Sequence, residues 1–359
     1  MEIQNLEIKK YLERKFKGEI KNIKIEKLGT GVLGIGYLLE FEYFGKKQKY
    51  VLKSMFTENL GMDHFSDRAA ILLLAHDSYN NMKNHVKSED VISVDSRGEL
   101  KSVGDSREYF ILMKEAKGKP LFETFNKIRE AGKLEKQDRD KIILLSNFLV
   151  DLHKQKKESI SLYRRKIRDT IGSGASIMGV LDMYPEKEYN ENREQWLEII
   201  KISINYWNLS KDLSYRNSEI HGDYHPGNLW FEEEKLTILD RSRGKTGEPA
   251  DDIASFLINP ILYCLIKEDY FKGVFKEVFD IFWNNYFKKT KDREMRKIIA
   301  PYFAFRTAVV CNPLFYNDDF FGGSEKAGNI RRKLIKFSLN ILRDNEFKPE
   351  KINHYINNR

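Results

Sequence analysis

The pattern of hydrophobic and polar positions divides this chain into an extended first part and a helical second part. Between residues 20 and 56 the apolar side chains follow strand-like runs, and Gly45-Lys46-Lys47 is typical of a turn between two of them. Beyond Gly118-Lys119-Pro120 the apolar positions recur every three or four residues, which indicates helices. The predicted helices span residues 121–131, 138–156, 193–208, 250–266, 274–288 and 293–311, and one hairpin at 228–240 interrupts them.

The first part also contains two predicted helices. One spans residues 5–17, where Ile8, Leu12 and Phe16 share a face, and the other follows Ser66 as its N-cap. Short extended segments are predicted near residues 90–95 and 108–113. Strands followed by helices predict an α+β protein with two lobes and a cleft between them. We place the strand-rich lobe at residues 1–116 and the helical lobe at 117–359.

Composition narrows the class of protein without identifying it. The 359 residues are 41% hydrophobic, which allows a sizeable core, and the two cysteines, Cys264 and Cys311, lie in apolar surroundings typical of buried thiols. The start of the chain is too polar for a signal peptide, and the longest apolar run, residues 256–266, is shorter than the roughly 18 residues of a membrane span. We expect a cytoplasmic protein that does not enter the membrane.

The net charge of +8 allows nucleic-acid binding in principle. A solvated basic surface is the simpler interpretation, because no basic run is interleaved with a nucleic-acid motif. Oligomeric state cannot be inferred from the sequence.

The segment His221-Gly222-Asp223-Tyr224-His225-Pro226-Gly227-Asn228 carries the most specific chemistry. Asp223 and Asn228 stand five positions apart, and Asp240 follows twelve positions later, after an apolar run. Asp223 can orient a hydroxyl group and accept its proton. Asn228 and Asp240 offer the hard oxygen ligands that Mg²⁺ prefers. Phosphoryl transfer from ATP needs these groups and little covalent help from the protein.

A glycine-rich segment lies between two predicted strands. Gly29, Gly31 and Gly34 form a G-x-G-x-x-G pattern, which by itself is also common in ordinary turns. A hairpin setting favours a kinase-type loop that covers phosphates over a dinucleotide fold, which needs a helix after the glycines. Lys53 follows in the next extended run and is a candidate for binding the α- and β-phosphates, although a lone strand lysine usually faces solvent.

Two further segments are candidates for nucleotide binding. Lys53 needs an acidic partner on the following helix, and Asp67 is the best placed by spacing; its alternative role is to stabilise the first turn of that helix. The predicted strand at 108–113 leads into Met113, Glu115 and Ala116, whose backbone groups can hold an adenine edge. The alternative is a plain connecting segment.

The segment with His221 and His225 is compatible with two other kinds of site. His221, Asp223 and His225 have a spacing that suits a transition metal, but they lack a third protein ligand of the usual kind and leave Asn228 unexplained. A catalytic triad is disfavoured because no Ser or Cys occupies a nucleophile elbow.

These motifs together resemble the aminoglycoside phosphotransferase/choline kinase family of kinase-like enzymes. The resemblance covers residues 25–260 and includes the catalytic segment, Ile238-Leu239-Asp240, and residues 247–254, which are similar to that family's Gly-Asp-Pro-Ala-x-Asp-Leu-Ala. It implies a small antiparallel β lobe, a larger α lobe, and ATP with Mg²⁺ between them. It also implies that Asp252 anchors the catalytic loop beside His221, that Leu152-His153 ends a helix, and that residues 113–116 form the hinge.

The chain departs from the family after Asp240 and after the Leu-His helix. Arginines occupy both places, and Arg forks match carboxylate and phosphate groups. We therefore predict a small-molecule acceptor that is anionic; the alternative is that Arg241 and Arg243 form structural ion pairs with Asp251 and its neighbours. The candidate acceptor arginines are Arg164, Arg165, Arg241 and Arg243.

Two alternative functions remain beside the small-molecule phosphotransferase. A protein Ser/Thr kinase-like activity needs a long activation segment, but only eleven residues separate Asp240 from Asp252. A pseudokinase that binds nucleotide without turnover is disfavoured by the joint presence of Lys53, Asp223, Asn228 and Asp240, although the absence of a helix Glu keeps this alternative open. The roles of the C-terminal helices near Arg306, Pro313 and Tyr316, and the choice between ATP and GTP, cannot be inferred.

Overall fold

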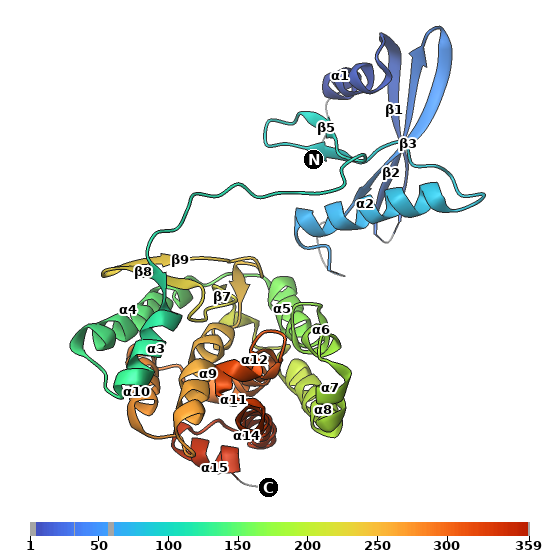
Figure 1. Cartoon of the computed structure of the whole chain (residues 1–359). Coiled ribbons are helices and arrows are strands. Elements are labelled where there is room, and N and C mark those ends of the chain that lie inside the picture. Colours follow the sequence, from blue (N-terminus) through green and yellow to red (C-terminus); the bar gives the residue numbers. More distant parts are fainter. Residues whose placement is uncertain (1–4, 32, 57–60, 358–359) are drawn as a thin grey trace. The chain divides into compact units, whose positions relative to one another are not determined.

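The computed structural model describes residues 5–31, 33–56 and 61–357 and divides the chain into two compact units. The first unit spans Met1–Met113 and the second spans Lys114–Arg359 (Figure 1). The first is built on an antiparallel sheet and the second is mainly helical, which confirms the predicted α+β class. The lobe boundary that we expect after residue 116 stays a prediction.

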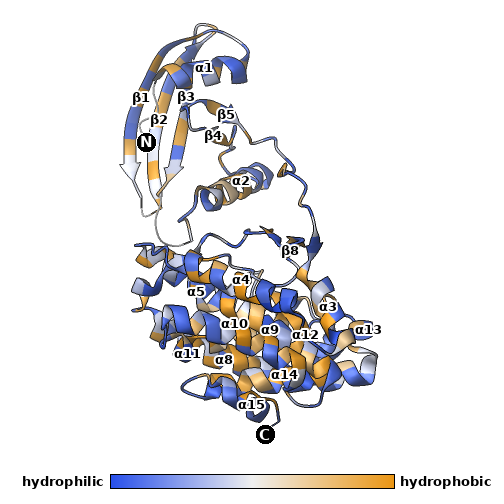
Figure 2. Ribbon diagram, turned by 90° about the vertical axis from the view of Figure 1, so that its left-hand side faces the viewer, coloured by the Kyte–Doolittle hydropathy of each residue, from blue (hydrophilic) through white to orange (hydrophobic). Residues whose placement is uncertain are grey.

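The first unit is organised around a three-stranded antiparallel sheet. Its strands are β1 (Ile20–Thr30), β2 (Gly34–Tyr43) and β3 (Lys46–Met55), in the order β1-β2-β3. Helix α1 (Asn5–Phe16) packs Ile8 and Leu12 against Ile20 and Phe41 in a small core. The strands alternate between hydrophilic and hydrophobic bands (Figure 2), as expected of a sheet with one buried face.

Two details of the first unit differ from the sequence prediction. Helix α2 (Phe65–Asn81) begins after His64, so Ser66 lies inside its first turn and is not the N-cap. The short hairpin β4 (Ile92–Val94) and β5 (Leu100–Ser102) confirms the first short extended segment. The strand predicted at 108–113 is wrong: no described strand pairs with these residues, and they form an exposed segment at the junction of the units.

The second unit surrounds one fully buried helix. Every residue of α9 (Ala250–Lys267) from Ala250 to Ile266 is buried, which accounts for the longest apolar run of the sequence. Helices α10 (Gly273–Thr290), α12 (Ala300–Cys311) and α14 (Ser324–Arg343) pack against it (Figure 1). The remaining helices are α3 (Leu121–Ala131), α4 (Lys136–His153), α5 (Ile160–Gly172), α6 (Ile177–Asp182), α7 (Glu186–Glu191), α8 (Arg193–Ser210), α11 (Met295–Ile298), α13 (Asp318–Phe321) and α15 (Ile352–Asn357).

Short strands of the second unit frame the predicted catalytic segment. The hairpin β8 (Leu229–Glu232) and β9 (Lys235–Ile238) is extended on one side by β6 (Lys119–Pro120). Strand β7 (Ser218–Glu219) pairs with β10 (Thr246–Gly247). These strands hold both ends of the segment that contains Asp223, so that its conformation is fixed by paired backbone on either side.

Several helix boundaries correct the sequence prediction. The helix predicted over 293–311 is divided into α11 and α12, and Pro301 lies in the first turn of α12, where a missing N–H is tolerated. Helices α5 and α14 were not predicted at all. Their polar faces are strongly charged, which obscures the buried positions of each.

Both cysteines are buried free thiols, as predicted, and burial raises the pKa of Cys264 to about 11. In the part of the chain that the structure describes, no helix is both long and apolar enough to cross a bilayer.

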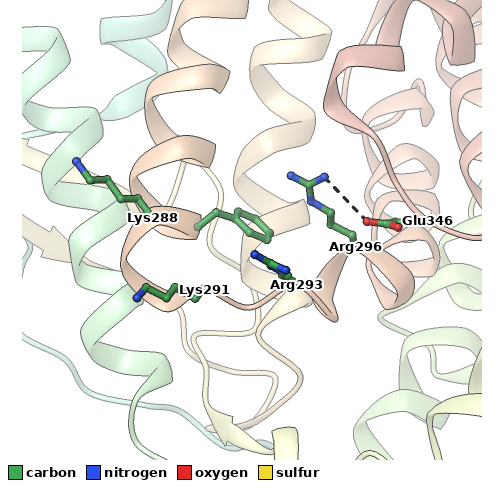
Figure 3. Close-up of a pocket in the computed structure, with 6 residues that line it drawn as sticks. Lys288, Lys291, Arg293, Arg296 and Glu346 are labelled. Atoms are coloured by element: carbon green, nitrogen blue, oxygen red, sulfur yellow. Dashed lines mark ion pairs between the residues drawn. The ribbon is translucent and has the colours of Figure 1, made fainter.

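A basic groove of about 550 Å³ lies at the C-terminal end of α10 (Figure 3). Lys288 and Lys291 occupy the end of this helix, where cations interact favourably with the helix dipole. Arg296 lies 5.9 Å from the ring centre of Trp283 and 4.0 Å from Glu346. These contacts give Lys288, Lys291 and Arg296 structural roles. Its lining residues are Phe287, Lys288, Lys291, Arg293, Arg296 and Glu346.

Candidate functional site in the second unit

The loop that carries Asp223 is anchored by hydrogen bonds to the buried carboxylate of Asp252. Oδ2 of Asp252 accepts a hydrogen bond from the backbone N–H of His221 (2.7 Å), and Oδ1 accepts one from Gly222 (2.7 Å). His153, at the end of α4, lies 3.1 Å from Oδ2 and is itself bonded to Tyr286. Burial alone would raise the pKa of Asp252, but these hydrogen bonds keep it below the ordinary value.

Histidine 221 uses both ring nitrogens within the protein. Its Nε2 lies 2.8 Å from the carbonyl oxygen of Leu239, and its Nδ1 accepts the backbone N–H of Asp223 at 3.2 Å. This network assigns the proton to Nε2. Nδ1 of His225 likewise accepts the N–H of Gly227 (3.1 Å). Among the described residues no group of three His, Cys, Asp or Glu side chains is placed to hold a metal, which disfavours the transition-metal alternative.

Asn228 and Asp240 are brought together by the hairpin between them. The backbone N–H of Leu239 donates to the carbonyl of Asn228 at 2.9 Å. Asp240 directly follows Leu239, so the two candidate ligands occupy neighbouring positions at the open end of the hairpin. The side-chain Nδ2 of Asn228 donates to the carbonyl of Asp223 (3.0 Å), which leaves the amide oxygen as the atom for a ligand. Asp240 is exposed and has a positive φ of 55°. One amide oxygen and one accessible carboxylate suit Mg²⁺, which retains several waters.

The carboxylate of Asp223 lies between two arginines and is only 8% exposed. Its Oδ1 accepts a hydrogen bond from Nη1 of Arg306, and its Oδ2 lies 3.3 Å from Nη2 of Arg243. Burial raises the pKa of Asp223, but the two guanidinium groups more than offset this, so the pKa is lower than usual. Asp223 is therefore ionised at neutral pH, as a proton acceptor must be.

Arg306 extends this arrangement into a buried network. Its Nη2 donates to Asp251 (2.6 Å) and to the carbonyl of Gly222 (2.9 Å). Lys166, on α5, lies 3.3 Å from the other oxygen of Asp251. Three cations thus surround two carboxylates at this end of the second unit. We call this set the Arg306 cluster; it consists of Lys166, Asp223, Arg243, Asp251 and Arg306.

A second buried arginine lies near the N-terminal end of α9. Arg216 donates from Nε and Nη2 to Glu248 (3.0 and 2.8 Å) and from both Nη atoms to Asp292 (2.7 Å each). Glu248 is 1% exposed and also accepts the hydroxyl of Tyr163 (2.7 Å). We call this set the Arg216 cluster; it consists of Tyr163, Arg216, Glu248, Asp292 and Glu294.

The predicted acceptor arginines have different surroundings. Arg243 contacts Asp223, as described above. Arg241 donates to the carbonyls of Ile220 (2.8 Å) and Lys245 (3.1 Å), which fits the structural alternative. Arg164 donates to the carbonyl of Lys211 (3.1 Å). Arg165 pairs with Asp169 one helical turn later at 3.1 Å.

The remaining candidates belong to the first unit or to the junction. Gly29 and Gly34 flank the hairpin connection between β1 and β2, and Gly31 donates to the carbonyl of Gly34 (2.9 Å), whereas Val32 lies outside the described residues. A side chain at Gly34 would come within 1.9 Å of the carbonyl oxygen of Ser54, so only glycine fits there.

Lys53 is an exposed residue of β3, opposite Gly36. Asp67 accepts the backbone N–H of His64 at 2.7 Å and so stabilises the first turn of α2. Met113 and Glu115 are exposed and Ala116 is half-buried, without strand structure around them.

Sequence reasoning missed Arg306 and Lys166 as members of the site. Arg306 is the single charge in an otherwise apolar stretch from Ala300 to Cys311. A charge in such a helix is buried and needs a partner, which was the available signal. Lys166 gives no comparable signal because arginines surround it in the sequence.

The sequence matches no protein-family model, and it matches no curated protein sequence. Among solved structures, the chain is similar to an amicoumacin kinase in complex with AMP-PNP and Ca²⁺ (14% identity, 97% of this chain and 100% of that one, TM-score 0.39). It is also similar to the aminoglycoside phosphotransferase APH(2'')-Ib bound to ADP (18% identity, 94% and 99%, TM-score 0.31).

A third similar structure is the choline kinase from Cryptosporidium parvum (14% identity, 93% of this chain and 86% of that one, TM-score 0.32). At such TM-scores these likenesses carry no argument about activity, which rests on the residues of the site. The proteins named are small-molecule kinases, which is the kind of enzyme that the sequence motifs resemble.

Proposed function

We propose that this protein is an ATP- and Mg²⁺-dependent phosphotransferase that acts on a hydroxyl group of a small molecule. One observation carries the proposal: an ionised, nearly buried Asp223 stands on a loop fixed by Asp252, beside the oxygen ligands Asn228 and Asp240. Phosphoryl transfer depends chiefly on positioning and electrostatics, and a loop anchored in this way provides positioning.

The proposed reaction assigns one role to each group. The acceptor oxygen forms a bond to the γ-phosphorus of ATP as the bond to the leaving ADP oxygen breaks, and the acceptor proton passes to Asp223. Asn228 and Asp240 would hold Mg²⁺, which neutralises phosphate charge when it is bound. Lys53 and the glycine segment of the first unit would bind the phosphates, and residues 113–116, which join the two units in the sequence, would bind the adenine.

The proposed acceptor carries an anionic group as well as a hydroxyl. The Arg306 cluster has three cations for two carboxylates, so its net charge is positive before any ligand binds. Arg243 is the member best suited to meet a ligand, because its side chain is 25% exposed. Its guanidinium also lies 5.2 Å from the ring centre of Phe305, which orients the fork.

Labelled nucleotide distinguishes this proposal from its alternatives. The protein is incubated with γ-labelled ATP, Mg²⁺ and pools of hydroxylated small molecules, and label is measured in the small-molecule and protein fractions. We expect label in a small molecule that carries a carboxylate or phosphate. Label on added protein supports a protein kinase, and nucleotide binding without turnover supports a pseudokinase.

Two variants make the assay specific to the site. Asp223→Asn should lower the rate of transfer by at least about 10²–10⁴-fold, whereas Asp151→Asn, at an exposed carboxylate of α4, should leave it unchanged. Full transfer by Asp223→Asn would show that this residue is not the proton acceptor.

A further inference from the structure

Arg306 occupies a position that differs from those of the other cations near Asp223. It projects from α12 and is only 4% exposed. Its two terminal nitrogens bond three oxygens, on Asp223, Asp251 and the backbone of Gly222. No solvent-borne ligand can reach such a guanidinium without first displacing these partners.

The contacts of Arg306 fix the orientation of the Asp223 carboxylate. Oδ1 is held by Nη1, while Nη2 of the same planar fork is tied to the main chain next to Asp223. A planar guanidinium that bonds both the side chain and the preceding carbonyl restricts rotation about the side-chain torsions of Asp223. Oδ2 is then the oxygen left to face an acceptor hydroxyl.

Arg243 reaches the other oxygen from a more open side. Its Nη2 lies 3.3 Å from Oδ2 of Asp223, and its Nη1 donates to the carbonyl of Ala175 at 2.9 Å. Phe305 lies beside both arginines, with ring-centre distances of 4.4 Å to Arg306 and 5.2 Å to Arg243. The two cations therefore contact different oxygens of one carboxylate, one from the interior and one from the exposed side.

We infer that Arg306 is a positioning residue for phosphoryl transfer: it holds Oδ1 of Asp223 so that Oδ2 faces the acceptor hydroxyl, while Arg243 contacts the acceptor itself. This inference rests on the proposed function. The two arginines then have separable effects, because an orienting contact acts on the rate of the bound complex and an acceptor contact acts on acceptor binding.

A purely structural role of Arg306 predicts a different outcome. Arg306 also joins α12 to α9 through Asp251, and loss of that ion pair destabilises the fold whatever happens at Asp223. The Arg216 cluster provides the matched case, since Arg216 is 5% exposed and also pairs with several carboxylates. Arg216→Lys keeps the charge and breaks the fork, as Arg306→Lys does.

Steady-state kinetics with the anionic acceptor that the labelling assay identifies test the inference. Arg306→Lys should lower kcat by about 10²-fold, the usual effect of a misplaced group, and change the KM of the acceptor less than about threefold. Arg243→Lys should instead raise that KM and leave kcat within about threefold. Arg216→Lys should lower the melting temperature without lowering kcat per folded molecule. Equal kcat for Arg306→Lys and wild type, at equal folded fraction, would overturn the inference.

A second measurement does not depend on turnover. Melting temperatures are compared for Arg306→Gln, Asp223→Asn and the double variant. If Arg306 holds Asp223, the double variant should melt close to the less stable single variant; fully additive losses would show that the two side chains do not act as a pair. If the wild-type protein transfers no phosphate to any acceptor, the proposed function fails, and this cycle still decides whether the contact exists.

Discussion

Two buried arginines in the second unit have similar chemistry and different surroundings. In the Arg216 cluster the guanidinium uses all three nitrogens on Glu248 and Asp292, and Nη1 also donates to Glu294, so the arginine keeps no nitrogen for a ligand. In the Arg306 cluster the Nε of the arginine has no hydrogen-bond partner among the described residues, and one oxygen of Asp223 faces the partly exposed Arg243. An arginine with every nitrogen bonded is typical of a structural role, and a partly satisfied one indicates function.

The contrast shows that burial of an ion pair does not by itself distinguish structure from function. What differs is whether a reacting atom remains accessible at the edge of the network. Asp223 retains such an atom in Oδ2, whereas the oxygens of Glu248 are bonded to Arg216 and Tyr163 in the interior.

The largest expected effect is the loss of transfer on Asp223→Asn. The amide keeps the shape of the side chain but cannot accept the acceptor proton, so the rate should fall by at least about 10²–10⁴-fold. The rate is measured from label transfer under single-turnover conditions. A loss of less than about tenfold would show that Asp223 is not the proton acceptor, and the Arg306 cluster would then have no role in the reaction.

The largest expected effect on stability is that of Arg216→Met. The change leaves the buried Glu248 and the half-buried Asp292 without their main partner, and breaking a buried pair costs about 3–5 kcal/mol. Denaturant unfolding measures the loss. Transfer per folded molecule should stay within about threefold of wild type, and a much larger fall would mean that this cluster too serves the reaction.

Arg243→Gln should act on acceptor binding. A charged hydrogen bond is worth about 1.5–3 kcal/mol, so the KM of an anionic acceptor should rise by at least about tenfold. Arg241→Gln is the matched control, because Arg241 is bonded to backbone carbonyls, and it should leave that KM nearly unchanged. Equal effects of the two variants would contradict an anionic acceptor held by Arg243.

The smallest effect concerns the pH dependence of stability. Burial raises the pKa of Asp292, but its bonds to Arg216 lower it more, so the pKa in the folded protein is below the ordinary value of about 3.9. The stabilisation is complete above the unfolded pKa and is lost as the pH falls through the folded one. As the pH falls below the unfolded pKa, the wild type should therefore lose more stability than Asp292→Asn in unfolding experiments. Parallel pH curves would contradict this.

Much of the fold can be read from local patterns in the sequence. Helix α3 begins and ends where its apolar spacing predicts, and α9 coincides with the longest apolar run. Helix α5 could not be recognised, because Arg164, Arg165 and Arg168 obscure the buried face of Tyr163 and Ile167. Residues 108–113 have the composition of a strand, but a strand also needs a partner, and partners cannot be read from the segment itself.

In the candidate site, too, some residues can be recognised from the sequence and others cannot. Asp223, Asn228 and Asp240 lie within one short stretch of sequence, where spacing indicates their chemistry, whereas the role of Asp252 is implied only by the family resemblance. Arg306 meets Asp223 across 83 residues, and only the packing of α12 against α9 brings them together. The arginine that the sequence places nearest to Asp240, Arg241, is bonded to backbone carbonyls instead. Residues close together in the sequence therefore indicate the proposed reaction, but they do not indicate that Arg306 contacts Asp223.

The most direct test of the account is a double-mutant cycle on the rate of phosphoryl transfer. Wild type, Arg306→Lys, Asp223→Asn and the double variant are compared under single-turnover conditions, with Arg216→Lys in place of Arg306→Lys as the control cycle. If Arg306 acts through Asp223, Arg306→Lys should slow the wild type about 10²-fold and should hardly slow Asp223→Asn, whereas Arg216→Lys should have the same small effect in both backgrounds. Equal, multiplicative losses from Arg306→Lys in the two backgrounds would contradict the account.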